Sequence, residues 1–368
     1  MRFLVSGYYG FGNIGDEALL HVIVSQLRTR YPYAEIDVLS ANAPHTAHDL
    51  RVEATPRWDA KAVRRAIRRA DVLLSGGGGL LQNATSLRSL VYYAGIIRAA
   101  VNAQRKTMIF AQSIGPLDFW GKTVVKECCK NVDAATVRDA RSAGLLNSLI
   151  PSVHVERTAD PVFLYDVPDE EADLTTEGLG PQSDPVVVFS VRKASGMKDR
   201  LDVLARAVDR LAQVHGARVA FLPLGGASDA EVSTLVIRKC KSAPVLLPEC
   251  DLPRAANIIR RARAVVGMRL HALIFAARFG VPFLAIPYDP KVTALCDDLR
   301  YPLPPLFVVN PPDRKPSADE TDRLVDRLWM ERDSLSALLL AAGERLRALA
   351  LRNFEVLDEV AGGKPLRT

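Results

Sequence analysis

The stretch RFLVSGYYGFGNIGDE, residues 2–17, decides the fold. It begins with a short apolar run, Arg2–Ser6, which reads as a buried strand, and continues into glycines spaced G-x-G-x-x-G at Gly10, Gly12 and Gly15. A helical pattern starts directly after the last glycine. A strand that passes through a tight glycine turn into a helix is the first half of a βαβ unit, so the sequence predicts a parallel sheet from its first residues.

The same alternation of short apolar runs and longer amphipathic stretches continues along the chain. The apolar runs are rich in β-branched residues, as expected for strands that are buried on both faces of a parallel sheet. Besides Arg2–Ser6, predicted strands cover Glu35–Leu39, Val72–Ser75, Thr107–Gln112, Ala134–Val137, Val186–Val191, Arg218–Leu222, Val245–Leu247, Ala264–Gly267 and Phe283–Pro287. Predicted helices include Glu17–Arg28, Ala60–Ala70, Leu87–Gln104, Lys198–His215 and Leu270–Arg278.

A change of composition over residues 166–185, which hold many acids and two late prolines, separates two sets of strands. We interpret this segment as a linker between a first Rossmann-like domain, 1–165, and a second, 186–316. Residues 317–361 are predicted to form C-terminal helices. The predicted fold class is α/β, with two Rossmann-like domains facing a cleft. Ligands of such sheets bind beyond the carboxyl ends of the strands, so the residues just after each strand are the candidates for a site.

Composition places the chain among ordinary globular proteins. Its 368 residues are 48% hydrophobic and 24% charged, which excludes the collagen-like, low-complexity and disulfide-rich classes. Five cysteines without a CxxC pair indicate neither a disulfide framework nor a zinc site, so no metal is expected. The sequence shows no signal peptide and no apolar stretch of the roughly 20 residues that span a bilayer, and we expect a cytoplasmic protein.

The net charge of +6 permits anionic substrates, nucleic acid or an anionic membrane surface as partners. Five basic residues within Ala60–Ala70 form one stripe on a predicted helix. We interpret the stripe as a solvated helix face. The alternative is peripheral docking on anionic lipid at the inner membrane face. Nucleic acid is not expected as a partner, because the sequence has no nucleic-acid fold signature and few aromatic residues among these cations.

The glycine pattern near the N-terminus is typical of dinucleotide binding, and Asp37 follows near the spacing of a ribose ligand. However, Asp16 and Glu17 fall in the first helical turn, where a pyrophosphate would bind and two carboxylates repel it. Asp37 also lies inside its strand rather than at its end. Two interpretations therefore rank above a dinucleotide site: a tight turn with an acidic helix start, and a site for sugar hydroxyls built on Asp16 and Glu17.

Three further strand ends in the first domain carry candidate residues. Four consecutive glycines, 76–79, are entropically costly, which indicates the close approach of a ligand or a second backbone at Gly77 and Gly78. A bare domain-packing turn is the alternative there. Gln112 ends the next strand in a compact polar loop. Arg138 follows the fifth strand. Two interpretations of this residue are equally supported: a solvated salt bridge, and a position in the cleft.

Cations gather after the strands of the second domain. Arg192 follows its first strand, Arg269 and His271 begin a predicted helix, and Lys291 follows the last strand. Cations at a helix N-terminus oppose the helix dipole, so a bound anion is expected to compensate them. The alternatives are a basic surface loop at Arg192 and a buried structural histidine at His271.

The loops GNIGDEA, SGGGGLLQ, AQSIGP and VRD, together with GMRLHALIFAA and PYDPK, resemble those of the polysaccharide pyruvyl transferases. Within that family they are most similar to the bacterial CsaB-type enzymes of secondary cell wall polymer and S-layer anchoring. The resemblance covers nearly the whole chain and implies a GT-B-like pair of Rossmann domains. It implies transfer of pyruvate from phosphoenolpyruvate, as a ketal, to a sugar, which in CsaB-type enzymes is a β-linked N-acetylmannosamine of a lipid-linked precursor.

The resemblance also assigns roles to residues. Arg138, His271 and Lys291 match the functional arginine, histidine and lysine of the family, and Arg269 matches the arginine of its R-L-H motif. The second domain then becomes the expected donor side, where Arg192 joins Arg269 and Lys291 in binding the phosphate and carboxylate of phosphoenolpyruvate.

The expected chemistry divides between the two domains. Histidine titrates near neutral pH, so His271 is the expected acid that protonates the enol methylene. Asp16 or Glu17, on the expected acceptor side, would orient or deprotonate the sugar hydroxyls. The reaction needs no metal and no cofactor besides the donor substrate. The expected partners are phosphoenolpyruvate and a lipid-linked or polymeric glycan.

Two other functions stay open from the sequence. The first is a GT-B glycosyltransferase that uses a nucleotide sugar, whose pyrophosphate the cations would hold. The second is a non-catalytic protein of the same fold that binds a glycan or an anion.

Overall fold

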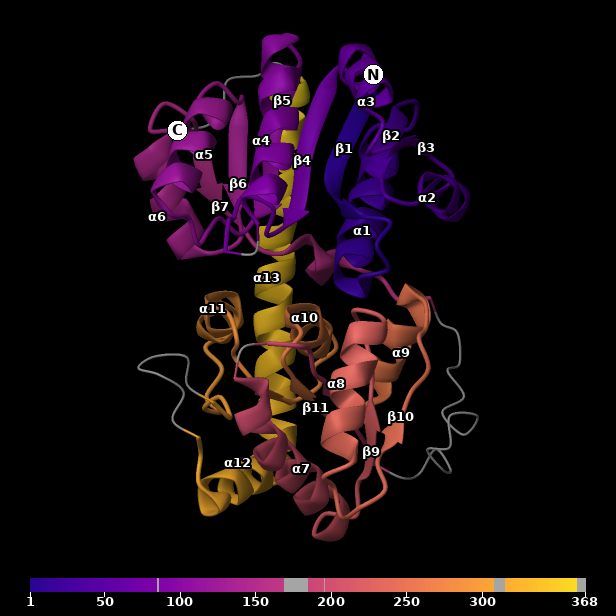
Figure 1. The fold of residues 1–368 in the computed structure, drawn as a ribbon, viewed down its shortest axis with the longest axis vertical. Coiled ribbons are helices and arrows are strands. Elements are labelled where there is room, and N and C mark those ends of the chain that lie inside the picture. The colour runs from indigo at the N-terminus through magenta and orange to yellow at the C-terminus, as the bar shows by residue number, and fades with distance from the viewer. Residues whose placement is uncertain (85, 169–184, 195, 308–314, 363–368) are drawn as a thin grey trace. The chain divides into compact units, whose positions relative to one another are not determined.

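A computed structural model describes residues 1–84, 86–168, 185–194, 196–307 and 315–362. The chain forms two compact units, each with its own sheet (Figure 1). Unit 1 comprises Met1–Tyr165 and Leu346–Thr368, and unit 2 comprises Asp166–Arg345. The linker predicted over residues 166–185 lies mostly outside the described residues.

Within the described residues, the sheet of unit 1 has seven strands, all parallel, in the order β3-β2-β1-β4-β5-β6-β7. The strands are β1 (Arg2–Tyr9), β2 (Glu35–Ser40), β3 (Glu53–Pro56), β4 (Val72–Gly78), β5 (Lys106–Gln112), β6 (Ala134–Val137) and β7 (Val155–Arg157). The helices are α1 (Ile14–Arg30), α2 (Ala43–Leu50), α3 (Ala60–Arg69), α4 (Leu87–Asn102), α5 (Phe119–Cys129) and α6 (Ala140–Leu149), with a 3-10 turn, η1, at Pro161–Leu164. The strand order reverses between β1 and β4.

As far as the structure describes unit 2, its sheet has five parallel strands in the order β10-β9-β8-β11-β12. The strands are β8 (Val186–Ser190), β9 (Arg218–Phe221), β10 (Val245–Leu246), β11 (Ala264–Gly267) and β12 (Phe283–Ala285). The helices are α7 (Met197–Gln213), α8 (Ala227–Ile237), α9 (Leu252–Arg261), α10 (Leu270–Arg278), α11 (Pro290–Leu299) and α12 (Ala318–Met330). Here the order reverses between β8 and β11.

The central strands of both sheets are buried on both faces. In β1 the side chains of Phe3, Leu4 and Val5 have no exposed surface, and every residue of β8 is buried. Helices therefore cover both faces of each sheet, as parallel sheets require. The predicted α/β class is confirmed, and the uninterrupted apolar runs in the sequence are its cause.

Helix α13 (Arg332–Ala361) begins in unit 2 and ends in unit 1. Its second half completes the core of unit 1: the ring centroids of Phe354 and Phe110 lie 5.0 Å apart. Nearby, the Thr158 hydroxyl donates to Asn353 Oδ1 at 2.7 Å, and both of these polar side chains are buried. The residues predicted as C-terminal helices thus serve both units.

Two short strands at the edges of the first sheet are absent from the prediction. The sequence of β3 is EATP and that of β7 is VER, and neither has a residue that is fully buried. Edge strands have a neighbour on one side only and need no apolar run, so the sequence gives little sign of them. Among the described helices, none is long and apolar enough to cross a membrane.

Candidate functional site

In unit 1, the carboxyl ends of β1 and β4 flank the point where the strand order reverses. Open α/β sheets bind their ligands at such a point. The loop from β1 to α1 contains Gly10 and Gly12, both with positive φ, at +77° and +72°. A Cβ on Gly10 would lie only 2.2 Å from Oγ of Ser40, so glycine is required there by the turn itself.

Asp16 and Glu17 lie in the first turn of α1, whose N-cap is Asn13. Glu17 Oε1 accepts a hydrogen bond from the Gly10 N–H at 2.9 Å, which ties the start of the helix to the glycine loop. Burial raises the pKa of Glu17. The bond from Gly10 lowers this pKa and the nearby Asp16 raises it again, and the net shift is upward. A carboxylate of raised pKa is a stronger base and is suited to take a proton from a hydroxyl.

The glycine run at the end of β4 packs against the same helix. Gly77 and Gly78 have φ values of +64° and +82°. A Cβ on Gly77 would lie 2.9 Å from Cδ1 of Leu19, and a Cβ on Gly78 would lie 3.1 Å from Oδ1 of Asp16. The atoms that approach these two glycines are side-chain atoms of α1, whereas the sequence predicts a ligand or a second backbone there. The structure brings Asp16, Glu17 and both glycines to one edge of the sheet.

Gln112 and Arg138 follow on the neighbouring strand ends, but both are buried. Gln112 Nε2 donates to the Ser75 carbonyl oxygen at 2.7 Å and so ties β5 to β4. Arg138 donates from Nε to Ser113 Oγ at 2.8 Å and forms an ion pair with Asp160. The exposed fractions of Arg138 and Asp160 are 7% and 4%. The salt bridge weighed in the sequence is present, but it is buried rather than solvated.

In unit 2, Arg269 follows β11 at the point where the strand order reverses, and its charge has a partner within the fold. Nε and Nη2 donate to the two carboxylate oxygens of Asp229 at 2.7 and 2.5 Å. The Asp229 side chain is 1% exposed. A Cβ on Gly225 would lie 1.8 Å from Arg269 Nη2, so the guanidinium packs directly on this glycine. The argument that Arg269 needs a bound anion is therefore wrong, because Asp229 supplies the negative charge.

Arg192 and Lys291 meet at one aromatic ring. Arg192 Nη1 donates to the Tyr288 hydroxyl at 2.8 Å, and its guanidinium carbon lies 4.6 Å from the ring centroid. Lys291 Nζ lies 5.5 Å from the same centroid and 3.7 Å from Oδ2 of Asp289. The structure thus brings together two predicted cations that stand 99 positions apart in the chain, and both keep part of their surface exposed.

His271 is the second residue of α10 and is half-buried. The N-cap position of this helix is Arg269, whose own side chain makes no capping hydrogen bond. The positive end of the helix dipole lies at this start, and it favours a negative charge there. Because Gly267 of β11 pairs with Ser190 of β8, the α10 start and Arg192 follow adjacent strand ends.

The sequence prediction does not include a group of aromatic residues near the carboxyl ends of the strands in unit 1. Arg57 is buried under the rings of Phe11, Trp58, Tyr92 and Tyr93, with its guanidinium carbon 4.6–5.2 Å from their centroids. Phe11 lies inside the glycine loop, and Trp58 follows the unpredicted strand β3. One sequence signal for this group is Phe11, an aromatic residue between two closely spaced glycines.

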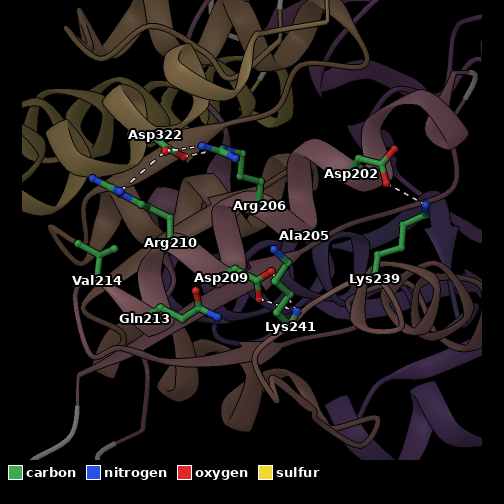
Figure 2. A pocket seen from close by; sticks show the side chains of 10 residues that line it. All are labelled: Asp202, Ala205, Arg206, Asp209, Arg210, Gln213, Val214, Lys239, Lys241 and Asp322. Atoms are coloured by element: carbon green, nitrogen blue, oxygen red, sulfur yellow. Dashed lines mark hydrogen bonds and ion pairs between the residues drawn. The ribbon is translucent and has the colours of Figure 1, made fainter.

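A pocket of about 300 Å³ in unit 2 contains none of the predicted site residues (Figure 2). Most of its charged side chains pair with one another: Arg206 and Arg210 contact Asp322, and Lys239 contacts Asp202. A lining whose charges are mostly paired offers little to an anionic substrate, so this pocket is not the candidate site.

Within the described residues, no three His, Cys, Asp or Glu side chains gather as a metal site requires. The absence of a metal and of a cofactor other than the donor substrate stays a prediction.

The chain matches the model of the polysaccharide pyruvyl transferase family over residues 13–290. This range contains every predicted site residue except Lys291, which follows it directly.

Solved structures of nucleotide-sugar enzymes have a similar fold. A putative UDP-N-acetylglucosamine 2-epimerase from Listeria monocytogenes is 10% identical, with a TM-score of 0.68 and coverage of 99% of this chain and 96% of that one. The S. aureus MnaA structure with UDP gives 10% identity, a TM-score of 0.70 and coverage of 100% and 99%. Anabaena Alr3699/HepE with UDP and glucose gives 12%, 0.64, and coverage of 99% and 100%. At such identities the likeness shows the fold alone, and it confirms the predicted GT-B-like class.

Proposed function

The chain belongs to the polysaccharide pyruvyl transferase family, and from this premise we propose that it transfers pyruvate from phosphoenolpyruvate, as a ketal, to a polysaccharide sugar, and releases phosphate. The proposed acceptor is an N-acetylmannosamine in a lipid-linked precursor of a bacterial cell wall polymer, as in CsaB-type enzymes.

One observation carries the assignment of the donor to unit 2: Arg192 and Lys291 converge on Tyr288, and Arg192 follows the strand next to the one that leads into α10. Phosphoenolpyruvate has a phosphate and a carboxylate, and each of these groups needs a cation or a set of N–H donors. Guanidinium binds such groups through two parallel hydrogen bonds, and ammonium binds them as a point charge. We assign Arg269 to the support of this site, because Asp229 fixes its orientation.

In the proposed reaction, His271 gives a proton to the methylene carbon of phosphoenolpyruvate, which leaves the central carbon electron-poor. A sugar hydroxyl attacks that carbon and its proton passes to a carboxylate, while the bond to the phosphate oxygen breaks. A second hydroxyl of the sugar then closes the ketal ring, and its proton restores His271. General acid catalysis of the first step is expected to contribute about 100- to 10,000-fold in rate.

We assign the acceptor hydroxyls to Asp16 and Glu17 in unit 1. The raised pKa of Glu17 supports a role as the base that takes the hydroxyl proton. Gly77 and Gly78 let α1 approach β4, and so place the Asp16 carboxylate over the edge of the sheet. Gln112 and Arg138 are buried and hold the neighbouring strand ends in place, so we propose that they position the site.

The proposal is tested by measuring phosphate release from phosphoenolpyruvate with a synthetic acceptor that contains N-acetylmannosamine. Release that depends on both substrates is expected. His271→Gln should lower turnover by about 100-fold or more, since an amide can donate a hydrogen bond but cannot protonate carbon. His48→Gln is the matched control, because His48 is an exposed histidine of α2. Near-normal turnover of the His271 variant would show that His271 is not the acid.

A nucleotide-sugar transferase is the second candidate, because the similar solved structures of MnaA and HepE contain UDP. A thermal-shift comparison separates the two functions. Stabilisation by phosphoenolpyruvate and not by UDP-sugars supports pyruvyl transfer, and the opposite result supports the alternative. Binding of phosphoenolpyruvate without release of phosphate would favour a non-catalytic binding protein.

The basic stripe on α3 supports a peripheral place at the inner membrane face, where a lipid-linked acceptor is found. Arg64, Arg65, Arg68 and Arg69 are all exposed, while Val63 and Ile67 face the core. Each cation near an anionic surface contributes about 1 kcal/mol. Flotation with anionic vesicles at low salt is expected to exceed flotation with neutral ones. Equal recovery of the protein with anionic and with neutral vesicles would show that the stripe does not bind the membrane. The proposed enzymatic function would be unaffected.

A further inference from the structure

Three exposed aromatic side chains form a continuous surface beside the candidate acceptor residues. The exposed fractions are 40% for Tyr8, 40% for Phe11 and 68% for Trp58. The rings of Tyr8 and Phe11 are stacked, with centroids 4.1 Å apart, and Trp58 meets Phe11 edge-on at 6.5 Å. We call these three residues the aromatic platform. Contiguous exposed apolar groups of this kind mark binding sites more often than scattered ones do.

The aromatic platform rests on a buried cation. Arg57 is 4% exposed; it donates from Nη1 to the Gly7 carbonyl oxygen at 2.9 Å and from Nη2 to the Tyr93 hydroxyl at 3.0 Å. Its guanidinium carbon lies 5.0 Å from the Phe11 centroid and 4.9 Å from the Trp58 centroid. A cation in these positions attracts the electron-rich ring faces and restricts the two rings. Rings that are ordered before a ligand arrives lose less entropy on binding.

The aromatic platform is also tied to the acidic helix start. Phe11 stands between Gly10 and Gly12, and Glu17 accepts the hydrogen bond of the Gly10 N–H at 2.9 Å. Tyr8 is the penultimate residue of β1, at the carboxyl end of this strand and just before that loop. Ring faces and carboxylates therefore lie along one sheet edge, at the reversal point where open α/β sheets take their ligands.

We propose that the aromatic platform is a glycan subsite, on which sugar rings of the acceptor stack by their C–H faces while Asp16 and Glu17 accept their hydroxyl protons. A pyranose has an apolar face and a rim of hydroxyls, and this combination matches flat aromatic rings next to carboxylates. The inference rests on the polysaccharide acceptor of the proposed function and adds residues to it. An anionic lipid surface is the competing occupant, because the cations of α3 begin soon after Trp58.

A matched pair of tryptophans makes the test sharp. Trp58 and Trp120 are 68% and 67% exposed, and Trp120 lies at the start of α5 with Phe119 as its ring neighbour. The probe is a synthetic oligosaccharide that contains N-acetylmannosamine, added without phosphoenolpyruvate while tryptophan fluorescence is recorded. We expect a saturable change in the unaltered protein and in Trp120→Phe, and its loss in Trp58→Phe. A change that persists in Trp58→Phe, or no change in any of the three proteins, would overturn the proposal.

Steady-state kinetics give a second and independent test of the glycan subsite. Trp58→Ala is expected to raise the KM for the oligosaccharide by about tenfold or more, as removal of a central aromatic contact commonly does, and to leave the KM for phosphoenolpyruvate unchanged. Trp120→Ala should change neither constant. Trp58→Phe keeps a ring and should restore most of the affinity, which separates a lost contact from a misfolded loop. Equal KM values for the two alanine variants would contradict the glycan subsite.

The outcomes distinguish this inference from the proposed function. A Trp58 signal with the oligosaccharide, in a protein that releases no phosphate, supports the subsite and contradicts the transferase. Normal phosphate release by Trp58→Ala at a limiting concentration of acceptor contradicts the glycan subsite but not the transferase function. A fluorescence change with sugar-free phosphatidylglycerol vesicles that equals the change with the oligosaccharide would assign the aromatic platform to a lipid surface and overturn the proposal.

Discussion

Arg269 and Asp229 form an ion pair between α10 and α8, with two hydrogen bonds and one nearly inaccessible carboxylate. The two residues stand 40 positions apart. The sequence around α10 identifies Arg269, but it cannot identify Asp229, which lies on another helix. For this reason the sequence predicts the place of Arg269 correctly, at a strand end, and mistakes what balances its charge.

We expect Arg269→Ala to lower the free energy of unfolding by about 3–5 kcal/mol, because the change leaves a buried carboxylate without its partner. Replacing both residues, as Arg269→Met with Asp229→Leu, should recover part of that loss. Lys291 is the matched cation: its side chain is 27% exposed and 3.7 Å from Asp289.

Lys291→Ala should leave unfolding nearly unchanged and weaken phosphoenolpyruvate binding by about 1.5–3 kcal/mol, the cost of one charge-assisted hydrogen bond. Urea unfolding and donor titration of both single variants measure the two effects. If Arg269→Ala and Lys291→Ala have equal free energies of unfolding, the ion pair of Arg269 is unimportant for stability.

Glu17 gives a prediction of pH dependence. Burial raises the pKa of Glu17, so the folded chain holds this proton more tightly than the unfolded chain does. The stabilising contribution is complete below the unfolded pKa, about 4.3, and is lost as the pH rises through the higher folded value. Glu17→Gln removes the ionisation and keeps an oxygen that accepts the Gly10 hydrogen bond.

We therefore expect Glu17→Gln to be more stable than the unaltered protein at pH 8, with the difference shrinking toward pH 4. The same variant should lose about 100-fold or more in turnover if Glu17 is the base. Thermal unfolding across this pH range and the phosphate assay test the two effects separately. A stability difference that is constant with pH would contradict the raised pKa.

At the scale of elements, the contact of β4 with α1 depends on glycine. Gly77→Ala places a Cβ 2.9 Å from Leu19 at a φ of +64°. The backbone conformation alone costs roughly 1–2 kcal/mol for a residue other than glycine, and the contact adds to it. Gly95 in α4 is the opposite case, because nothing lies within 4 Å of its added Cβ.

Gly95→Ala should therefore stabilise by up to about 1 kcal/mol, through helix propensity. Urea unfolding of the two alanine variants is expected to give shifts of opposite sign. A shift of the same sign in both would mean that α1 can move away from β4 without cost.

The elements show what a sequence can reveal. Apolar runs predict the central strands, since burial on both faces demands such residues, and all of these strands begin within one residue of the prediction. Predicting strands from apolar runs fails where a strand is only partly buried, so β3 and β7 at the sheet edges are missed. Because β3 is missed, the position of Trp58, which follows it, is missed as well. The strand-end rule locates Asp16, Arg192 and His271 from sequence, whereas their hydrogen-bond partners depend on tertiary packing.

At the scale of the whole molecule, unit 1 is built from two separate parts of the chain. Phe354 of α13 is fully buried in it, and on the same helix Leu349 is 40% exposed. Phe354→Ala should cost about 3–5 kcal/mol, as truncation of a buried aromatic residue does. Leu349→Ala should change stability by roughly 0.5 kcal/mol or less.

Hydrogen exchange of the amides in β5, next to Phe110, is the measurement for this pair. Faster exchange is expected in the Phe354 variant and not in the Leu349 variant. Equal exchange rates would mean that unit 1 is stable without this helix.

The division of α13 between the units also sets the order in which a nascent chain acquires structure. The sheet of unit 1 leaves the ribosome before unit 2, but the helical segment that covers Phe110 is translated after unit 2. At about 5–20 residues per second, the interval between Tyr165 and Leu346 is on the order of 10–40 s. Throughout that interval an apolar face of the nascent sheet lacks its cover and is open to chaperones. The unit that is synthesised second is therefore the first whose residues are all present.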